Sequence, residues 1–247
     1  MKPTASIEQA IEDFRKGRFL ILVDDKSREN EGDFVLAAEY ATAEKINFLT
    51  KHARGLICVP IEQERAAKLC LELMVAKGKN TSMHHSAFTV SVDVREGTTT
   101  GISAYDRART VLALADENAK PDDFAEPGHI FPLTAEKGGV LKRAGHTEAA
   151  IDMAKLAGLK PAAVICEILA ENGKMARMPE LKKISSKHST KIIAIADLIK
   201  YRLQNEKLVY KITGTNFPNK YSKDFTLAAY GTEIDDNIHV ALLHKEN

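Results

Sequence analysis

The sequence predicts a layered domain of helices and strands that is followed by a short β-rich appendage. Segments with helical and strand periodicity alternate through about the first 200 residues, a pattern typical of helices packed on a sheet. The length of 247 residues and the hydrophobic content of 44% suffice for one large domain of this kind. The composition shifts at residues 204–207, beyond which only short strand-like runs remain. We therefore expect one domain over residues 1–203 and a β segment over residues 207–247.

Apolar stripes and capping residues define the predicted helices. Ser6 with Gln9 favours a capping box at the first helix, and Thr42 and Ser103 are expected to begin the next two. The predicted helices span residues 6–17, 42–54, 103–115, 147–158, 178–188 and the second half of 191–203. The predicted strands span 19–23, 34–38, 56–60, 87–93, 129–133, 162–169, the first half of 191–203, 208–213, 225–231 and 238–244. The charged segment 24–33 and the glycine-rich segment 136–147 are predicted loops.

The charge balance and the cysteine content exclude several classes of function. The 35 Lys and Arg residues nearly cancel the 34 Asp and Glu residues, so the net charge of +1 predicts no nucleic-acid or membrane partner. Three cysteines without a C-x-x-C pair do not predict a disulfide framework and fit a reducing compartment. The N-terminus lacks the pattern of a signal peptide, and no apolar stretch is long enough to cross a bilayer. These features predict a cytoplasmic protein.

Five carboxylates crowd the predicted loop DDKSRENEGD, which covers residues 24–33 between two apolar strands. Only Lys26 and Arg28 offset them, which is electrostatically unfavourable without a further counter-charge. A bound divalent cation would relieve this repulsion. The alternative is a solvated acidic turn, which is the usual setting of a charge run.

The segment GGVLKRAGHT, residues 138–147, combines groups that can bind an anion. Arg143 can make a bidentate contact with phosphate, Gly145 permits close backbone approach, and Thr147 lies at a predicted helix N-terminus. The neighbouring His146 is a candidate metal ligand. The alternatives are a plain N-cap for Thr147 and a surface-loop position for His146, and a glycine-rich segment alone is a weak indicator.

Two further polar side chains stand out from their surroundings. Glu167 interrupts the apolar run AAVICEIL, where an unpaired carboxylate would be costly to bury, so it needs a partner or a function. His129 lies in EPGHIFPL, where a rigid turn would hold its imidazole for acid–base work. The alternatives are a strand-end glutamate that faces solvent and a structural histidine. Cys58 is expected to be a buried core residue.

Taken together, these segments resemble 3,4-dihydroxy-2-butanone-4-phosphate synthase, a family of riboflavin biosynthesis. The resemblance covers about residues 6–203 and rests on DDKSRENEGD, TTTGISAYDRART, EPGHIFPL, GGVLKRAGHTEAAIDMAKLAGLKPAAVICEI and GKMAR, in that order. It implies an α+β fold, an α/β/α layered sandwich around a mixed sheet, in a homodimer. It also implies a lyase that converts D-ribulose 5-phosphate to 3,4-dihydroxy-2-butanone 4-phosphate and formate, with Mg2+ or Mn2+ as cofactor and two ions per site.

The resemblance also implies which positions bind the metal and the substrate. Glu29 and His146 match the metal ligands of the family, and residues 143–147 match its phosphate-holding segment. The positions expected to contact the substrate are Arg28, Glu29, Asp33, Arg143, Ala144, Gly145, His146, Thr147 and Glu167.

For catalysis, the resemblance points to His129 and Glu167, which match residues essential to the family's reaction. Asp33 and Glu31 are further candidates for moving protons. Positions near the site are matched by Thr100, Ser103 and Cys58. Two other functions remain open, namely a non-catalytic phosphosugar-binding or scaffolding module, and an isomerase or epimerase that stops at the enediolate.

The chain departs from the family pattern at three places. His84-His85-Ser86 replaces the usual His-Gly-Thr, Tyr105 replaces a small residue, and Asn172-Gly173-Lys174 replaces Asp-Gly-Thr. None of these removes an expected metal or catalytic position, and the first bears on the shape of the loop near residue 85. The appendage resembles the opening strands of GTP cyclohydrolase II, a domain often fused behind the synthase, but it has no cysteine for a zinc site.

Overall fold

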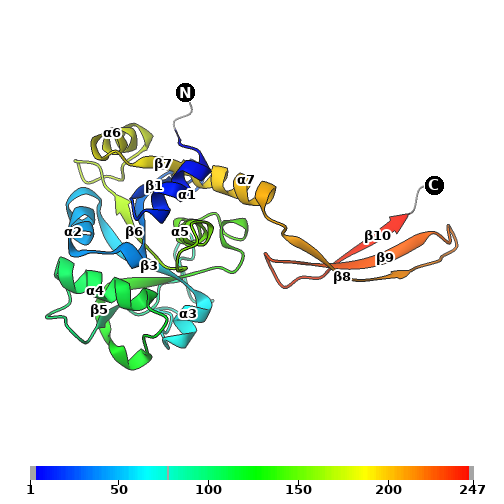
Figure 1. The fold of residues 1–247 in the computed structure, drawn as a ribbon, viewed down its shortest axis with the longest axis horizontal. Helices are drawn as coiled ribbons and strands as arrows, with labels where there is room; N and C mark the ends of the chain where they lie inside the picture. The colour runs from blue at the N-terminus through cyan, green and yellow to red at the C-terminus, as the bar shows by residue number, and fades with distance from the viewer. Residues whose placement is uncertain (1–3, 77, 245–247) are drawn as a thin grey trace. The chain divides into compact units, whose positions relative to one another are not determined.

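The structure, a computed structural model, describes residues 4–76 and 78–244. The chain divides into two compact units, Met1–Ile199 and Lys200–Asn247. Among the described residues, the first unit is built on a seven-stranded mixed sheet in the order β4-β5-β3-β6-β2-β1-β7 (Figure 1). The pairs β1–β7 and β3–β5 are parallel, and the other neighbours are antiparallel. The strands are β1 (Leu20–Val23), β2 (Gly32–Ala37), β3 (Arg54–Glu62), β4 (Val92–Val94), β5 (Phe124–Ala135), β6 (Ala163–Ile168) and β7 (Lys191–Ala194).

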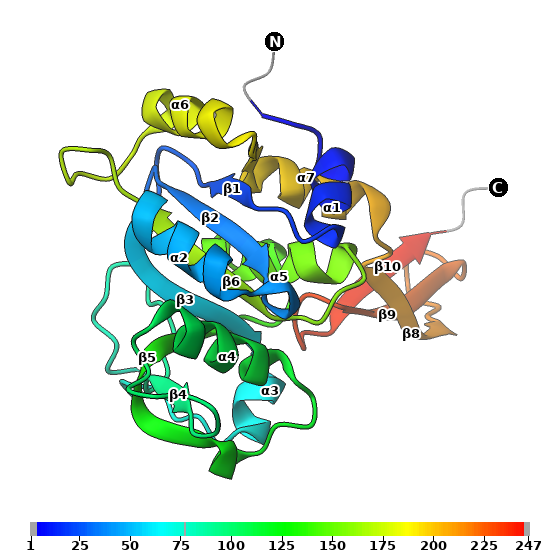
Figure 2. The same cartoon turned by 60° about the vertical axis from the view of Figure 1, so that its left-hand side comes forward.

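Helices cover both faces of this sheet (Figures 1 and 2). Helix α5 packs against α1 on one face, and α2 packs beside α4 on the other. Strands β1 and β2 are buried along their whole length, as a middle layer should be. The α-helices are α1 (Ile7–Arg15), α2 (Ala43–His52), α3 (Gln63–Lys68), α4 (Ala104–Ala115), α5 (His146–Leu156), α6 (Met178–His188) and α7 (Ile195–Asn205). The predicted α/β/α sandwich around a mixed sheet is confirmed.

Three predicted helix starts are confirmed by their side-chain caps. Ser6, Thr42 and Ser103 each accept a hydrogen bond from the backbone N–H three residues on, at 3.3, 3.3 and 3.0 Å. The helices that they begin bury apolar side chains such as Phe14 and Leu49 without any exposed area. Each cap therefore fixes the start of a helix whose apolar face closes the core.

Two strands near the candidate site are longer than predicted. β2 begins at Gly32, so Asp33 lies in the sheet and not in the acidic loop. β3 continues through Pro60 to Glu62, because residues 58–62 pair in parallel with β5, while pairing with β6 ends at Cys58 apart from a single bridge at Ile61. A proline has no backbone N–H to donate, so it costs little at a position where β3 no longer pairs regularly with β6.

The region around His129 also differs from the prediction. β5 extends over Phe124–Ala135, so His129 lies within a long strand and not in a rigid turn before a short one. The strand expected over residues 87–93 forms a named strand only at its end, in β4, and makes isolated bridges at Phe88 and Thr89. The pairing of β4 with β5 shifts register after Val92, which explains why regular pairing is short here.

The second unit contains a three-stranded antiparallel sheet in the order β10-β9-β8. Its strands are β8 (Val209–Asn216), β9 (Phe225–Thr232) and β10 (His239–His244), close to the predicted runs. Large apolar side chains such as Ile212 and Leu242 remain half exposed. Helix α7 continues to Asn205, and its last turn carries an ion pair between Arg202 and Glu206 at 2.8 Å. In the described part of the chain, no helix has the length and apolar character needed to span a membrane.

Candidate metal and substrate site

Segments that are far apart in sequence bring polar side chains together at one end of the central strands. β1 leads into the acidic loop at Asp24, and β2 begins directly after that loop. β6 runs antiparallel to β2, so its last residues lie beside the first residues of β2. The N-terminus of α5, which begins after Gly145, contributes His146. The end of β6 contributes Glu167.

The acidic loop is folded around Asp24, whose side chain is 1% exposed. The Asp24 carboxylate accepts the backbone N–H groups of Glu29 and Glu31, both at 2.9 Å. It also accepts Nη1 of Arg28 at 3.0 Å. Nη1 of Arg177 donates to the carbonyl oxygen of Glu29 at 2.9 Å. These contacts make an ordered loop and not a solvated acidic turn, and sequence reasoning missed the part that Asp24 and Arg177 play in it.

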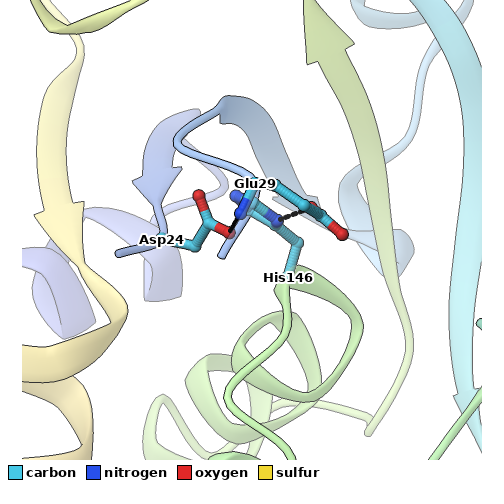
Figure 3. Close-up of side chains that lie close together, drawn as sticks. All are labelled: Asp24, Glu29 and His146. Carbon is cyan, nitrogen blue, oxygen red and sulfur yellow. Dashed lines mark hydrogen bonds and ion pairs between the residues drawn. The ribbon is translucent and has the colours of Figure 1, made fainter. Parts of the chain in front are cut away.

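Asp24, Glu29 and His146 each offer a ligand atom, and these three atoms lie within 4.8 Å of one another (Figure 3). Nδ1 of His146 lies 3.5 Å from Oε2 of Glu29. Nε2 of His146 is buried and has no hydrogen-bond partner among the described residues. A buried polar atom without a partner is costly, so this nitrogen is suited to a ligand. Carboxylate oxygens with one imidazole are a donor set that fits a divalent cation.

Charges within this group perturb one another strongly. The hydrogen bond with His146, aided by Arg28, lowers the pKa of Glu29 to about 2 against the effect of burial. Burial opposes protonation of His146, but the carboxylates of Asp33 and Glu29 outweigh it and raise its pKa to about 9. Burial raises the pKa of Asp33 to about 7, an effect that His146 opposes and Glu167 reinforces. Such perturbed groups in one place indicate a functional site.

Asp33 and Glu167 are directly opposite each other in the β2–β6 ladder, so their side chains leave the same face of the sheet. Oε2 of Glu167 accepts the backbone N–H of Leu56 at 2.8 Å. Glu167 is half-buried and therefore does not simply face solvent from a strand end. The hydrogen bond fixes one of the two carboxylate oxygens of Glu167.

Arg143 has partners on two sides. Its Nη1 lies 2.6 Å from Oε2 of Glu148, a side chain that is 1% exposed. Its Nη2 donates to the carbonyl oxygen of His84 at 3.0 Å and to Oγ of Ser86 at 3.2 Å. Nε2 of His84 in turn lies 3.7 Å from Oε1 of Glu29. The hydrogen bonds of Arg143 therefore hold the loop near residue 85 beside the acidic loop. His84 is a neighbour of the site that sequence reasoning did not identify.

His129 lies apart from this group. Strand β3 separates β5 from β6, so His129 stands two strands away from Glu167. Within the described residues, no hydrogen bond or ion pair joins it to Glu29 or His146; its partner is Asp93. Cys58 is buried in the core, where burial and the nearby Glu167 raise the pKa of its thiol.

An α/β/α sandwich with clustered carboxylates and a buried imidazole nitrogen that makes no hydrogen bond among the described residues has the features of a metal-dependent enzyme. Residues 8–201 match the model of the 3,4-dihydroxy-2-butanone 4-phosphate synthase family. The chain belongs to this family. A curated relative, riboflavin biosynthesis protein RibBA of Cytophaga hutchinsonii, is 54% identical over 239 residues. The match covers 96% of this chain but only 58% of that relative, so the chain spans little more than half its length.

Solved structures share the fold. The two-domain 3,4-dihydroxy-2-butanone 4-phosphate synthase RibBX from A. baumannii superposes with a TM-score of 0.89 at 46% identity, covering 98% of this chain and 70% of that one. A 3,4-dihydroxy-2-butanone 4-phosphate synthase in complex with two magnesium ions superposes with a TM-score of 0.77 at 40% identity, covering 81% of this chain and 98% of that one.

Proposed function

We propose that the chain is a lyase that converts D-ribulose 5-phosphate to 3,4-dihydroxy-2-butanone 4-phosphate and formate. The observation that carries this proposal is the Asp24–Glu29–His146 group beside Asp33 and Glu167, in a chain of this family. The reaction removes a proton next to the substrate ketone and later releases one carbon as formate. It therefore needs charge stabilisation and proton carriers in the same place.

We propose Mg2+ or Mn2+ as the cofactor, held by Glu29 and His146. Nε2 of His146, which makes no hydrogen bond among the described residues and lies 4.0 Å from Oδ1 of Asp33, and the convergence of ligand atoms support a cation here. The related structure that contains two magnesium ions supports two ions per site. A bound ion would stabilise negative charge that develops on adjacent substrate oxygens.

The protein's own residues would bind the substrate and move its protons. A carboxyl such as Asp33, with a pKa of about 7, can both take and return a proton near neutral pH. Glu167, whose Oε2 accepts the N–H of Leu56, is proposed as a second group that moves protons. Arg28 contacts Glu29 at 3.1 Å and is proposed to bind the substrate beside it. Arg143 and the N-terminus of α5, residues 143–147, are proposed to hold the phosphate.

We propose a homodimer as the working form and the cytoplasm as its location. Ile102 and Tyr105, 54% and 71% exposed, lie in the segment that follows Gly101, which abuts His129. A second copy of the chain that covers these side chains would bring His129 to an interface. The three free cysteines agree with a reducing compartment.

A stoichiometric formate assay tests the proposed function. We expect one formate for each ribulose 5-phosphate consumed, loss of activity after exhaustive treatment with EDTA, and recovery when Mg2+ or Mn2+ is added. An isomerised pentose phosphate without formate would identify an isomerase or epimerase. Binding without turnover would identify a non-catalytic module, and full activity after chelation would contradict the metal.

We further propose residues 1–203 as the synthase domain and residues 207–247 as a partial GTP cyclohydrolase II-like segment. A chain cut after Glu206 keeps the Arg202–Glu206 ion pair at the end of α7. We expect it to retain formate release and the mass of a dimer of the shortened chain in light scattering, because the residues proposed to bind the metal lie in the first unit. The uncut chain should show no GTP cyclohydrolase activity, because no cysteine lies beyond Cys166. Loss of formate release on truncation would mean that the segment completes the site or the dimer.

A further inference from the structure

The imidazole of His129 is held by one carboxylate at two points. Oδ1 of Asp93 accepts the backbone N–H of His129 at 2.9 Å. Oδ2 of Asp93 lies 2.6 Å from Nδ1 of the His129 ring. The Asp93 side chain is 13% exposed and the His129 side chain 42% exposed, so the carboxylate is covered while the ring reaches solvent. The two contacts together fix both the strand position and the ring orientation of His129.

Two glycines leave the space that this pair occupies. Gly101 has a φ of +92°, and a Cβ added there would lie 1.9 Å from Oδ2 of Asp93 and 2.6 Å from Nδ1 of His129. Gly128 precedes His129 on β5, and a Cβ added there would lie 2.0 Å from the carbonyl carbon of Val92 and 2.2 Å from the backbone nitrogen of Asp93. Backbone atoms cannot give way as a flexible side chain can. The chain therefore leaves no room for a side chain on either side of the Asp93–His129 contact.

We infer that Asp93 is a positioning residue for His129 in the proposed lyase reaction. This inference rests on the proposed lyase function and on the family resemblance that assigns His129 to catalysis. Asp93 is a carboxylate and accepts hydrogen bonds, so the ring nitrogen facing it must carry the proton. Nδ1 is thereby protonated, and Nε2 of the neutral ring is left as a proton acceptor. Asp93 sets the tautomer and the direction of Nε2, and does not itself touch the substrate.

The substitution Asp93→Asn keeps the size of the side chain and an oxygen for the His129 N–H. Its amide group would face Nδ1 as a donor, which favours the tautomer with the proton on Nε2. Nε2 would then no longer accept a proton. We expect kcat for formate release to fall about 100-fold, the lower end of a general acid–base contribution, with KM changed by less than about threefold. The control Asp123→Asn, at an exposed carboxylate that accepts a hydrogen bond from the N–H of Lys120, should leave both constants unchanged.

A double variant separates positioning from a general structural role. If Asp93 acts through His129, Asp93→Asn in a His129→Gln background should lower kcat no further, because the group that it positions is already gone. A multiplicative further loss in the double variant would overturn the inference. So would an Asp93→Asn enzyme with kcat within threefold of the parent.

Nitrogen NMR of histidine-labelled protein tests the tautomer without any assay of activity. At alkaline pH, the His129 ring of the parent chain should carry its proton on Nδ1, and the Asp93→Asn chain should shift it to Nε2. The His129→Gln chain assigns the signal. A parent ring protonated on Nε2 would overturn the inference even if formate is released. If no formate is released, the proposed function is wrong and the kinetic experiments cannot be carried out. The tautomer measurement still decides how Asp93 holds His129.

Discussion

The substitution Glu29→Gln is expected to lower kcat for formate release about 1000-fold, or about 4 kcal/mol, while the protein stays folded. The hydrogen bond with His146, aided by Arg28, lowers the pKa of Glu29 to about 2, so this carboxylate stays charged. An uncharged amide is a poor ligand for a divalent cation in place of a carboxylate. Binding of Mn2+, measured by calorimetry on the parent and the variant, should weaken in parallel with turnover.

The fold should tolerate this change because two effects oppose each other. The variant loses the attraction of Glu29 to His146 and Arg28, but it also loses repulsion from Glu31 and Asp33, whose pKa values Glu29 helps to raise. We expect the midpoint of thermal unfolding to change by less than about 4 °C, or about 1 kcal/mol for a protein of this size. Glu12→Gln, at an exposed ion pair on α1, is the matched control and should change nothing. Turnover within fivefold of the parent would show that Glu29 is not a metal ligand.

The substitution Arg143→Ala is expected to raise KM for ribulose 5-phosphate by about 30-fold to 1000-fold, more than it lowers kcat. A phosphate remote from the reacting carbons is held alike in the ground and transition states, and a charge-assisted bidentate contact contributes about 2–4 kcal/mol. The substitution also removes the hydrogen bonds of Arg143 with His84 and Ser86, which hold the loop near residue 85 in place. Steady-state kinetics of formate release measure both constants.

The buried ion pair of Arg143 complicates that experiment, and a second variant resolves it. Removal of the guanidinium leaves the Glu148 carboxylate buried without it, which costs about 3–5 kcal/mol of stability. Glu148→Gln in the same chain removes that charge and keeps an acceptor for the N–H of Glu136. The double variant should regain thermal stability and keep the raised KM. An unchanged KM in the double variant would show that Arg143 does not hold the phosphate.

Much of the fold could be predicted from the sequence, because the signals for helices and strands are local. Caps such as Ser6 and Ser103 lie three residues from the N–H that they accept, and the order of helices and strands follows from periodicity. The limits of the strands do not follow from such local signals. Asp33 has the sequence surroundings of an acidic loop, but it belongs to β2 and pairs with Glu167. Pairing of Gly32 with Val23 of β1, and of Asp33 with both Leu22 and Glu167, extends β2 into the acidic segment, and propensity does not encode such pairing.

For the site, sequence motifs gave the candidate ligands but not their surroundings. RENEGD and the GHT motif indicated Glu29 and His146, which the structure places 3.5 Å apart, and their role as metal ligands stays a prediction. The closeness of His84 to Glu29 and the pairing of Asp93 with His129 join segments 55 and 36 residues apart. No periodicity or capping rule relates such residues, so only the folded chain reveals these contacts.

The burial of Cys58 and Cys166 lowers the reactivity of these two thiols toward oxidants. Burial, with Glu167 and Asp33 nearby, raises the pKa of both thiols, and the thiolate is the form that peroxide and alkylating reagents attack. Cys70 is exposed, at the end of α3. We therefore expect oxidants and alkylating reagents to modify the exposed Cys70 before the two buried thiols.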